Sequence, residues 1–212
     1  MPIEVEAKFR ADNAEPLVEL ATRPRLGRAA LGEPRTVDEE DRYLDTDDGR
    51  LAAARWACRL RTREGTTRIS LKGPPSEPID RWQHRRPELE GPASASVDPE
   101  GWPASPALEL LVSLSGGHPL VERLRLEQAR SERSVSLDDG SSIGTLTMDR
   151  VRMTAGDVDL GELFVVELEL DASGQGEAEL NDLAAALEAI DGIVAEPRSK
   201  LEHALQRLAE RR

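Results

Sequence analysis

The sequence of 212 residues contains one cysteine, Cys58, so no disulfide can form within the chain. A chain without disulfides is typical of a reducing compartment, and we expect a cytoplasmic protein. No apolar run approaches the roughly 20 residues that a membrane-spanning helix needs. The first residues are charged and alternate with apolar ones, which is unlike a signal peptide. We therefore expect no contact with a membrane.

Aromatic residues are also scarce, at 3% of the chain, so Leu, Val, Ala and Ile must form the core. Histidine occurs only as His84, His118 and His203, without a metal-binding spacing, and we assign these residues no role. The net charge of -13 argues against a partner such as duplex nucleic acid, which normally binds basic proteins. A local basic cluster could still bind a phosphorylated small molecule.

What the sequence does contain is a strict alternation of charged and apolar residues from Ile3 to Phe9. Successive side chains of a β-strand point to opposite faces, so Glu4, Glu6 and Lys8 are predicted to share one face. Such a face suits either solvent or a polar cavity that holds a metal and an anion.

The same alternation returns in four later runs, which are flanked by turn signals. Acidic and basic pairs occupy separate runs, whereas water-exposed strands usually mix in Ser, Thr and Gln. A solvent-facing sheet remains the alternative for any one run, but the recurrence favours a cavity. The charged residues that share a face within each run are Arg59 with Arg61, Arg68 with Lys72, Arg86 with Glu88 and Glu90, and Glu167 with Glu169.

The apolar faces of these runs need a cover, and helices are the candidates. We expect helices over residues 13–22, 108–114, 119–126, 181–190 and about 199–211, and further strands near 128–137, 143–154 and 158–170. Residues 24–41 are predicted as loop or short strand. The fold class is therefore α+β, a closed or nearly closed antiparallel barrel that is polar inside and clad by helices outside. A β-sandwich with salt-bridged exposed faces is the alternative.

The charged residue types indicate a metal and a phosphate chain. Carboxylates without histidine or cysteine partners are hard oxygen ligands that suit Mg²⁺ or Mn²⁺. Pairs of arginines can grip phosphate oxygens bidentately. Buried like charges repel one another, and a metal together with a triphosphate would balance both sets at once.

Seven short motifs follow one another along the chain: Glu-x-Glu-x-Lys at 4–8, Tyr-x-Asp-Thr at 43–46, Arg-x-Arg at 59–61, Leu-Lys-Gly at 71–73, Arg-x-Glu-x-Glu at 86–90, Glu-x-Glu at 167–169 and Arg-Ser-Lys at 198–200. In this order they resemble the motifs of CYTH domains, also called triphosphate tunnel metalloenzymes. The resemblance spans residues 3 to about 205. It implies one domain over residues 1–212, built as an eight-stranded antiparallel β-barrel that forms a tunnel.

The resemblance also implies roles for individual residues. Arg130 and Arg133 stand for a later basic pair of the family, although a spacing of three does not keep one strand face, and Arg125 is the substitute. Lys200 is expected either in one mouth of the tunnel or on the surface of a helix. The metal would be held by Glu4, Glu6, Glu88, Glu90, Asp149, Glu167 and Glu169. The phosphates would be bound by Lys8, Arg59, Arg61, Lys72, Arg86, Arg130, Arg133 and Lys200.

The function implied is the metal-dependent hydrolysis of a triphosphate, most simply inorganic tripolyphosphate, since the scarce aromatic residues suggest no nucleobase pocket. Lys8, Tyr43 and Glu6 would be catalytic, with Tyr43 alternatively a packing residue. The alternatives within the family are a class IV adenylate cyclase, which converts ATP to cyclic AMP, and a thiamine triphosphatase. A non-catalytic module that binds polyphosphate or nucleotide is the alternative outside enzymes. We expect a monomer or a homodimer.

Overall fold

The computed structural model describes residues 2–75, 81–171 and 177–211, which contain eleven strands and five helices. The strands are β1 (Ile3–Ala11), β2 (Arg25–Leu26), β3 (Ala29–Leu31), β4 (Arg35–Thr46), β5 (Ala57–Arg63), β6 (Thr66–Lys72), β7 (Gln83–Pro92), β8 (Leu120–Ser136), β9 (Ser142–Ala155), β10 (Val158–Leu170) and β11 (Ile193–Ala195). The helices are α1 (Glu15–Thr22), α2 (Arg50–Ala53), α3 (Pro106–Ser115), α4 (Glu177–Glu188) and α5 (Lys200–Ala209).

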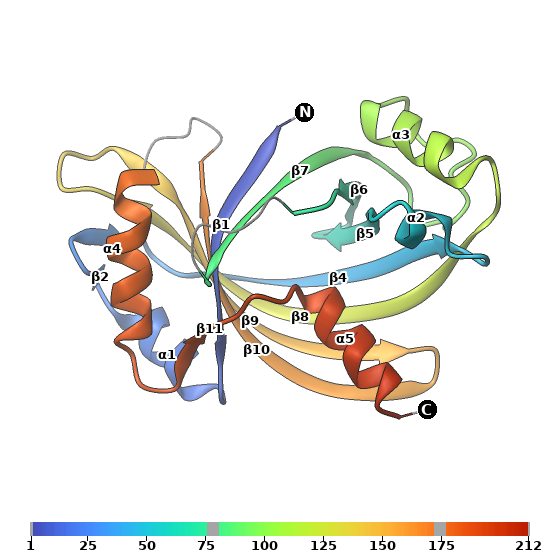
Figure 1. The fold of residues 1–212 in the computed structure, drawn as a ribbon. Coiled ribbons are helices and arrows are strands. Elements are labelled where there is room, and N and C mark those ends of the chain that lie inside the picture. Colours follow the sequence, from blue (N-terminus) through green and yellow to red (C-terminus); the bar gives the residue numbers. More distant parts are fainter. Residues whose placement is uncertain (1, 76–80, 172–176, 212) are drawn as a thin grey trace.

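Eight of the strands close into a barrel (Figure 1). Their order is β8-β4-β5-β6-β7-β1-β10-β9, and β9 pairs with β8 to complete the ring. Every pairing around the ring is antiparallel. The short strands β2 and β3 extend the sheet beside β8, and β11 pairs with β1 beyond the end of β7. The predicted α+β fold with an eight-stranded antiparallel barrel is therefore confirmed.

The alternating sequence pattern determines which side chains enter the barrel. In β1 and β10 the apolar residues Phe9, Val166 and Leu168 are fully buried on the outer face. There they join one apolar cluster with residues of α1 and α4. A second outer cluster joins residues of β4, β5 and β6, among them Cys58, to α2 and α3. Charged residues of the opposite parity, such as Lys8, Arg59 and Glu167, are left on the inner face.

Helix α5 lies at one end of the barrel and packs differently from the other helices. Ala204 contributes to an apolar cluster with Leu126, Val151 and Val165, which have the inward strand parity. The helix thus covers the inner face of β8, β9 and β10 at that end. A capping box fixes its start, since the Ser199 hydroxyl accepts a hydrogen bond from the amide of Glu202.

One expectation about secondary structure is wrong, and another, a loop or short strand over residues 24–41, is confirmed only in part. Residues 119–126 form the start of β8 rather than a helix, because Leu124, Leu126 and the following even positions pack inward while β4 and β9 supply backbone partners. Residues 24–41 contain β2, β3 and the first half of β4. In the described residues, no helix has both the length and the apolar character needed to cross a membrane.

Candidate active site

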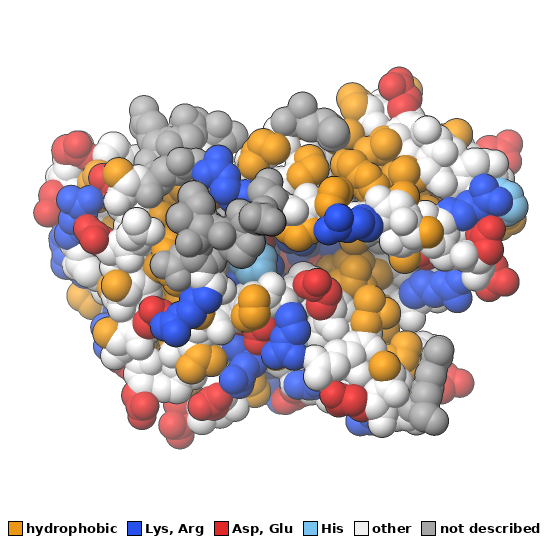
Figure 2. Space-filling model, viewed as in Figure 1, with side chains coloured by type: hydrophobic (Ala, Val, Ile, Leu, Met, Phe, Trp, Pro, Cys, Tyr) orange, Lys and Arg blue, Asp and Glu red, His pale blue; other side chains and the backbone are white. Residues whose placement is uncertain are grey.

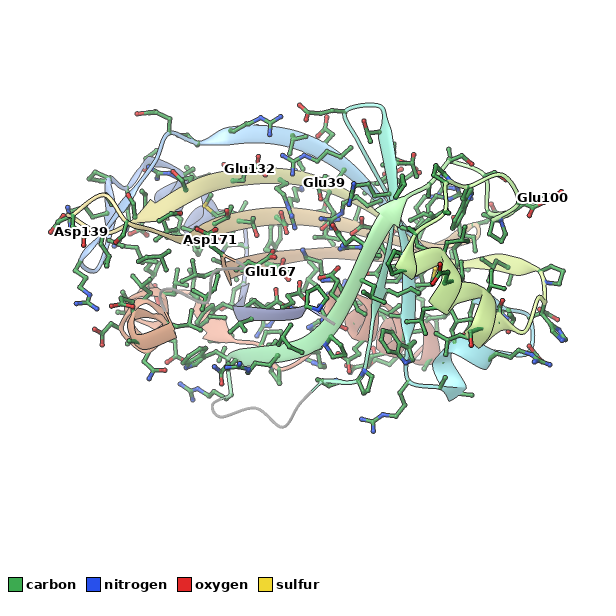
Figure 3. The ribbon with its side chains drawn as sticks, turned by 90° about the horizontal axis from the view of Figure 1, so that it is seen from above. Glu39, Glu100, Glu132, Asp139, Glu167 and Asp171 are labelled. Atoms are coloured by element: carbon green, nitrogen blue, oxygen red, sulfur yellow. The ribbon has the colours of Figure 1, made fainter. Side chains whose placement is uncertain are left out.

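The inner face of the barrel borders a cavity of about 540 Å³, a size typical of small-molecule sites. Seen from above, the loops that carry Asp139 and Glu100 lie at opposite ends of the molecule, with Glu39 and Glu167 between them (Figure 3). The carboxylates that line the cavity are Glu4, Glu6, Glu88, Glu90, Glu167 and Glu169. The cations that line it are Lys8, Arg59, Arg61, Lys72, Arg86, Arg130 and Lys200.

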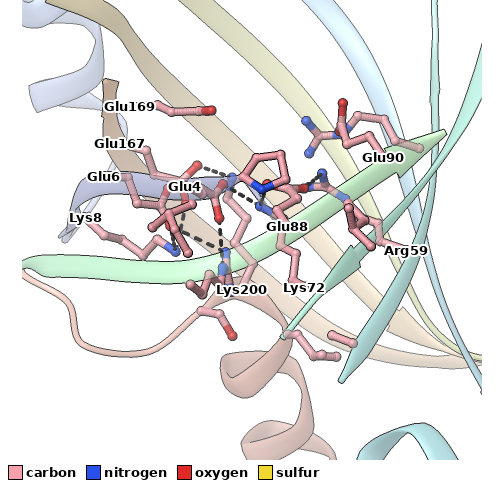
Figure 4. Close-up of a pocket in the computed structure, with 18 of the residues that line it drawn as sticks. Glu4, Glu6, Lys8, Arg59, Lys72, Glu88, Glu90, Glu167, Glu169 and Lys200 are labelled. Carbon is pink, nitrogen blue, oxygen red and sulfur yellow. Dashed lines mark hydrogen bonds and ion pairs between the residues drawn. The ribbon is translucent and has the colours of Figure 1, made fainter. Parts of the chain in front are cut away.

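These charged residues form two walls. The acidic wall consists of the six lining carboxylates, which come from β1, β7 and β10. The basic wall consists of Arg59 and Arg61 of β5 and Arg130 of β8. Three further cations, Lys8, Lys72 and Lys200, are interleaved with the acidic wall (Figure 4). A fourth, Arg86, lies against Glu4 and Glu6 of that wall.

Lys8 is almost completely buried within the acidic wall. Its Nζ lies 2.9 Å from Glu6 Oε1 and 3.4 Å from Glu167 Oε1. Burial opposes the charged form, but these two carboxylates outweigh it and raise the pKa of Lys8 above its ordinary value. Lys8 is therefore a firmly protonated ammonium in this state, suited to bind an anion rather than to take a proton from water.

Glu4 accepts hydrogen bonds from Lys72 Nζ at 2.5 Å and from Arg86 Nε at 2.8 Å. Burial acts against its charge, yet Lys72 and Arg86 lower the pKa of Glu4 below the ordinary value. Lys72 also lies 3.1 Å from Glu88 Oε2. Lys72 and Arg86 therefore compensate the charge of Glu4, and Lys72 also lies beside Glu88.

At the opposite side of the cavity, Lys200 donates to Asp149 at 2.6 Å and to Glu167 at 2.9 Å. Arg130 binds Asp149 through two bonds of 2.8 and 2.7 Å. Burial opposes ionisation of both carboxylates, but the cations keep the pKa values of Asp149 and Glu167 low. Lys200 thus points into the barrel from the first turn of α5, and the alternative of a surface position is wrong.

The basic wall rests on carboxylates that stand behind it. Asp41 of β4 is fully buried and accepts two hydrogen bonds of 2.7 Å from Arg61. Glu39, also buried, lies 3.1 Å from Arg61 Nη1 and 3.6 Å from Arg130 Nη1. The arginines that face the cavity are therefore held by carboxylates on the side away from it.

Tyr43 lines the cavity next to the basic wall, with Arg59 as its partner on β5. Burial and the nearby Asp41 raise the pKa of the Tyr43 hydroxyl. The phenol therefore stays neutral at ordinary pH and can donate a hydrogen bond to a bound oxygen. It also packs against the apolar cluster below α5, so its two predicted roles are compatible.

Glu169 differs from the other lining carboxylates. Its side chain makes no hydrogen bond or ion pair with any residue that the structure describes, and it is exposed to the cavity. The surrounding protein partly desolvates this carboxylate, and the negative charges of Glu4 and Glu6 lie nearby. Together they raise the pKa of Glu169 to about 7. This is a site where negative charge is concentrated and not compensated.

The donor set fits a hard divalent cation, because carboxylate oxygens are the ligands that Mg²⁺ and Mn²⁺ prefer. Within the described ranges, no three acidic, histidine or cysteine side chains converge into a preassembled metal site. Several of the carboxylates are instead occupied by protein cations, as Glu4 is by Lys72. A metal would therefore be held by Glu169 together with Glu6, Glu4 or Glu88, after these side chains leave their present partners.

Counting charges supports the same conclusion. Seven cations line the cavity, whereas six carboxylates line it and three more, Glu39, Asp41 and Asp149, stand behind them. The protein cations are already opposed by at least as many carboxylates. A polyanion such as triphosphate would therefore need additional positive charge to be bound tightly.

The structure does not bring all of the predicted residues together. The prediction that Arg133 faces the tunnel is wrong: it lies on the outer face, where it donates to the carbonyl oxygens of Leu20, Arg23, Leu31 and Gly32. The spacing of three that separates it from Arg130 is the reason, since it changes the strand face. Two other departures are the substitute Arg125, which pairs with Glu122 and Glu40 away from the cavity, and Asp149, which stands behind the lining. Glu90 lines the cavity as predicted, but at its exposed edge near Arg68.

Sequence reasoning missed the carboxylates of β4. Glu39, Asp41 and Tyr43 alternate along this strand just as Glu4, Glu6 and Lys8 alternate along β1. The signal was present, but residues 24–41 were not expected to form a long strand. The Asp45 carboxylate of the Tyr-x-Asp-Thr motif is structural, since it accepts hydrogen bonds from the amides of Leu51 and Ala52 in α2.

Comparison with known proteins agrees with this architecture. Residues 2–205 match the CYTH domain. A protein from Hippeastrum, named for adenylyl cyclase and described as having a dominant triphosphatase activity, has a similar structure, with a TM-score of 0.63 and 17% identity over 96% of this chain and 95% of its own. A candidate adenylate cyclase from Bacillus halodurans is similar with a TM-score of 0.61 and 18% identity over 95% and 98% of the two chains.

A protein from Pyrococcus horikoshii is also similar, with a TM-score of 0.52 and 21% identity over 99% of each chain. At these identities the likeness to the solved structures concerns the fold. No protein with a curated description matches the sequence. Because the domain match covers nearly the whole chain, this protein belongs to the CYTH domain family.

Proposed function

We propose that this protein hydrolyses a triphosphate, most simply inorganic tripolyphosphate, with the help of Mg²⁺ or Mn²⁺. The observation that carries the proposal is that a basic wall and an acidic wall face one cavity of about 540 Å³, with Glu169 of the acidic wall lacking a cation partner among the described residues. The dominant triphosphatase activity described for the Hippeastrum protein lends support.

We assign different roles to the residues that line the cavity. Arg59, Arg61 and Arg130 bind phosphate oxygens, since arginine is suited to bidentate contact with phosphate. Lys8, as an ammonium, and the neutral Tyr43 hydroxyl position the terminal phosphate and the water that attacks it. When bound by the glutamates, the divalent ion supplies charge neutralisation and a water of lowered pKa.

In the reaction itself, the oxygen of the water forms a bond to the terminal phosphorus, the water gives up a proton to solvent, and the bond from phosphorus to the bridging oxygen breaks. The products are phosphate and a diphosphate. The cations described above compensate the charge that develops on the bridging oxygen as it leaves.

An organic triphosphate is the second candidate, and a specific observation favours it. The same cavity has apolar lining residues, among them Ile3, Ala57, Leu89, Pro106 and Leu201. Figure 2 shows hydrophobic side chains gathered near α3, beside a hollow between α3 and α5. This apolar side could contact the organic group of ATP or thiamine triphosphate, and a cyclase would act on ATP in the same position.

The test is a panel of substrates assayed in parallel. Purified protein is incubated with Mg²⁺ or Mn²⁺ and with tripolyphosphate, ATP or thiamine triphosphate, and both phosphate release and cyclic AMP are measured. We expect phosphate from tripolyphosphate to dominate. Cyclic AMP as the main product would replace this proposal with the cyclase, and tight binding without turnover of any substrate would leave a binding module.

Further proposals concern Cys58, the cellular location, the partners and the oligomeric state of the protein. Cys58 is buried, and burial raises the pKa of its thiol to about 12, so it is an unreactive packing residue. We propose a cytoplasmic protein that acts on small molecules as a monomer or homodimer, with no nucleic acid or membrane as partner. Size-exclusion chromatography with light scattering tests the oligomeric state.

A further inference from the structure

Asp41 is one of the fully enclosed carboxylates behind the basic wall. Its side chain is fully buried and accepts from Arg61 Nε and Nη2, each at 2.7 Å. Gln128 Nε2 of β8 donates a third bond, also of 2.7 Å. Three short bonds, two of them from one guanidinium, fix both the carboxylate and the plane of Arg61.

Arg59 is held less firmly by the same carboxylate. Its Nη1 lies 3.5 Å from Asp41 Oδ2, and its Nη2 lies 3.7 Å from Glu88 Oε1. Its Nε is buried and has no hydrogen-bond partner among the described residues. Arg59 therefore keeps donors that a ligand in the cavity can satisfy, while Asp41 anchors it electrostatically.

Asp41 lies where it can affect phosphate binding indirectly, through Arg59 and Arg61. Burial opposes its charge, but Arg59 and Arg61 outweigh this and hold the pKa of Asp41 below its ordinary range, so it is ionised at neutral pH. A guanidinium that is already oriented loses less side-chain entropy when it binds phosphate. Asp41 itself does not line the cavity and cannot touch the substrate.

We propose that Asp41 is a positioning residue for triphosphate binding, acting through Arg61 first and Arg59 second. This inference rests on the proposed function, because it assigns a purpose to the orientation of phosphate-binding arginines. The competing explanation is that Asp41 only neutralises two buried cations. A carboxylate that only neutralises would tolerate a change of position, whereas one that positions would not.

The experiment measures the binding of tripolyphosphate by calorimetry, with and without Mg²⁺, for the wild type and for the variants Asp41→Asn, Asp41→Glu and Arg61→Ala. We expect Asp41→Asn to weaken binding about 10-fold or more. In the Arg61→Ala background the same change should have much less effect, since coupled residues are not additive. Asp41→Glu keeps the charge but displaces it, and should also weaken binding.

Glu40→Gln is the matched control, because Glu40 is the neighbouring acid on β4 and pairs with Arg125 away from the cavity. It should bind tripolyphosphate like the wild type. If Asp41→Asn does not fold, Asp41→Glu decides alone: full affinity would overturn the positioning role. Equal additive losses in the wild-type and Arg61→Ala backgrounds would overturn it as well. A wild type that binds tripolyphosphate under neither condition would instead refute the proposed function, and this inference with it.

Discussion

The two walls of the cavity carry opposite charges, and they differ in how far partners within the protein compensate those charges. In the basic wall, Arg61 and Arg130 each form paired hydrogen bonds with a buried carboxylate, Asp41 or Asp149. In the acidic wall, Glu169 has no partner among the described residues and its pKa is raised to about 7. The acidic wall therefore keeps one carboxylate without a partner, although its other members pair with Lys or Arg.

This difference shows how the cavity can combine binding with selectivity. The basic wall is oriented in advance, so it can receive phosphate oxygens with little rearrangement. The acidic wall keeps mutual repulsion that a divalent cation would relieve. The site should therefore respond strongly to metal and only moderately to the loss of a single phosphate contact.

The largest expected effect follows from removing divalent ions. With excess EDTA, turnover of the triphosphate substrate should fall to background, and Mg²⁺ or Mn²⁺ added in excess of the chelator should restore it. Phosphate release measured before and after the addition checks this. Turnover that persists undiminished in chelator would show that the acidic wall needs no cation and that the contrast between the walls has another cause.

A smaller but still large effect is expected from Glu169→Gln, which keeps the volume and removes the charge. If Glu169 holds the metal, turnover should fall about 100-fold or more, since a bound metal contributes several kcal/mol to charge stabilisation. Glu162→Gln is the matched control, because Glu162 lies on the same strand β10 and pairs with Arg150 at the surface. Equal activity of the two variants would remove Glu169 from the metal site.

Lys72→Ala should have a moderate effect that falls mainly on binding. Lys72 lies in the cavity between Glu4 and Glu88, and the loss of one charge-assisted contact costs about 1.5–3 kcal/mol. We expect tripolyphosphate affinity to drop about 10- to 100-fold by calorimetry. Arg68→Ala on the same strand, where Arg68 is exposed and does not line the cavity, serves as the control. Similar losses in both variants would indicate a general charge effect.

The smallest effect concerns stability and pH in the presence of EDTA. The pKa of Glu169 rises from 4.5 to about 7 in the folded state, so folding loses stability as the pH rises through that range. Glu169→Gln removes this penalty. Because the side chain is exposed, screening limits the gain, and we expect a melting temperature about 2 °C higher at pH 8. Near pH 4.5 the two proteins should melt alike; a constant difference across pH would contradict the charge explanation.

The sequence predicts the inner lining of this barrel well, because a period of two assigns each side chain to a face. It places Glu4, Glu6 and Lys8 together, and Glu167 with Glu169, as the structure has them. The sequence-based prediction fails where the local hydrophobic pattern suits one secondary structure and pairing with neighbouring strands imposes another. Residues 119–126 carry apolar spacing that also suits a helix, and only the neighbours β4 and β9 make them a strand.

Other features of the site could not be predicted from the sequence alone. The pairing of Asp41 with Arg61 depends on β4 lying beside β5 in one particular register. Arg133 looks like a phosphate ligand by type, yet it binds backbone carbonyls of the segment from α1 to β3. Charge and spacing identify which residues are able to bind a metal or a phosphate, whereas strand register decides which of these side chains contact one another.

The position of β1 within the ring has a consequence for how this protein is made. Its neighbours are β7 and β10, so β1 is synthesised well before both of the strands with which it pairs. Glu167 then joins Lys8 to Lys200, residues near opposite ends of the sequence. Such distant contacts form slowly, because long loops must close first. On a ribosome the cavity therefore cannot be complete until α5, which supplies Lys200, has emerged.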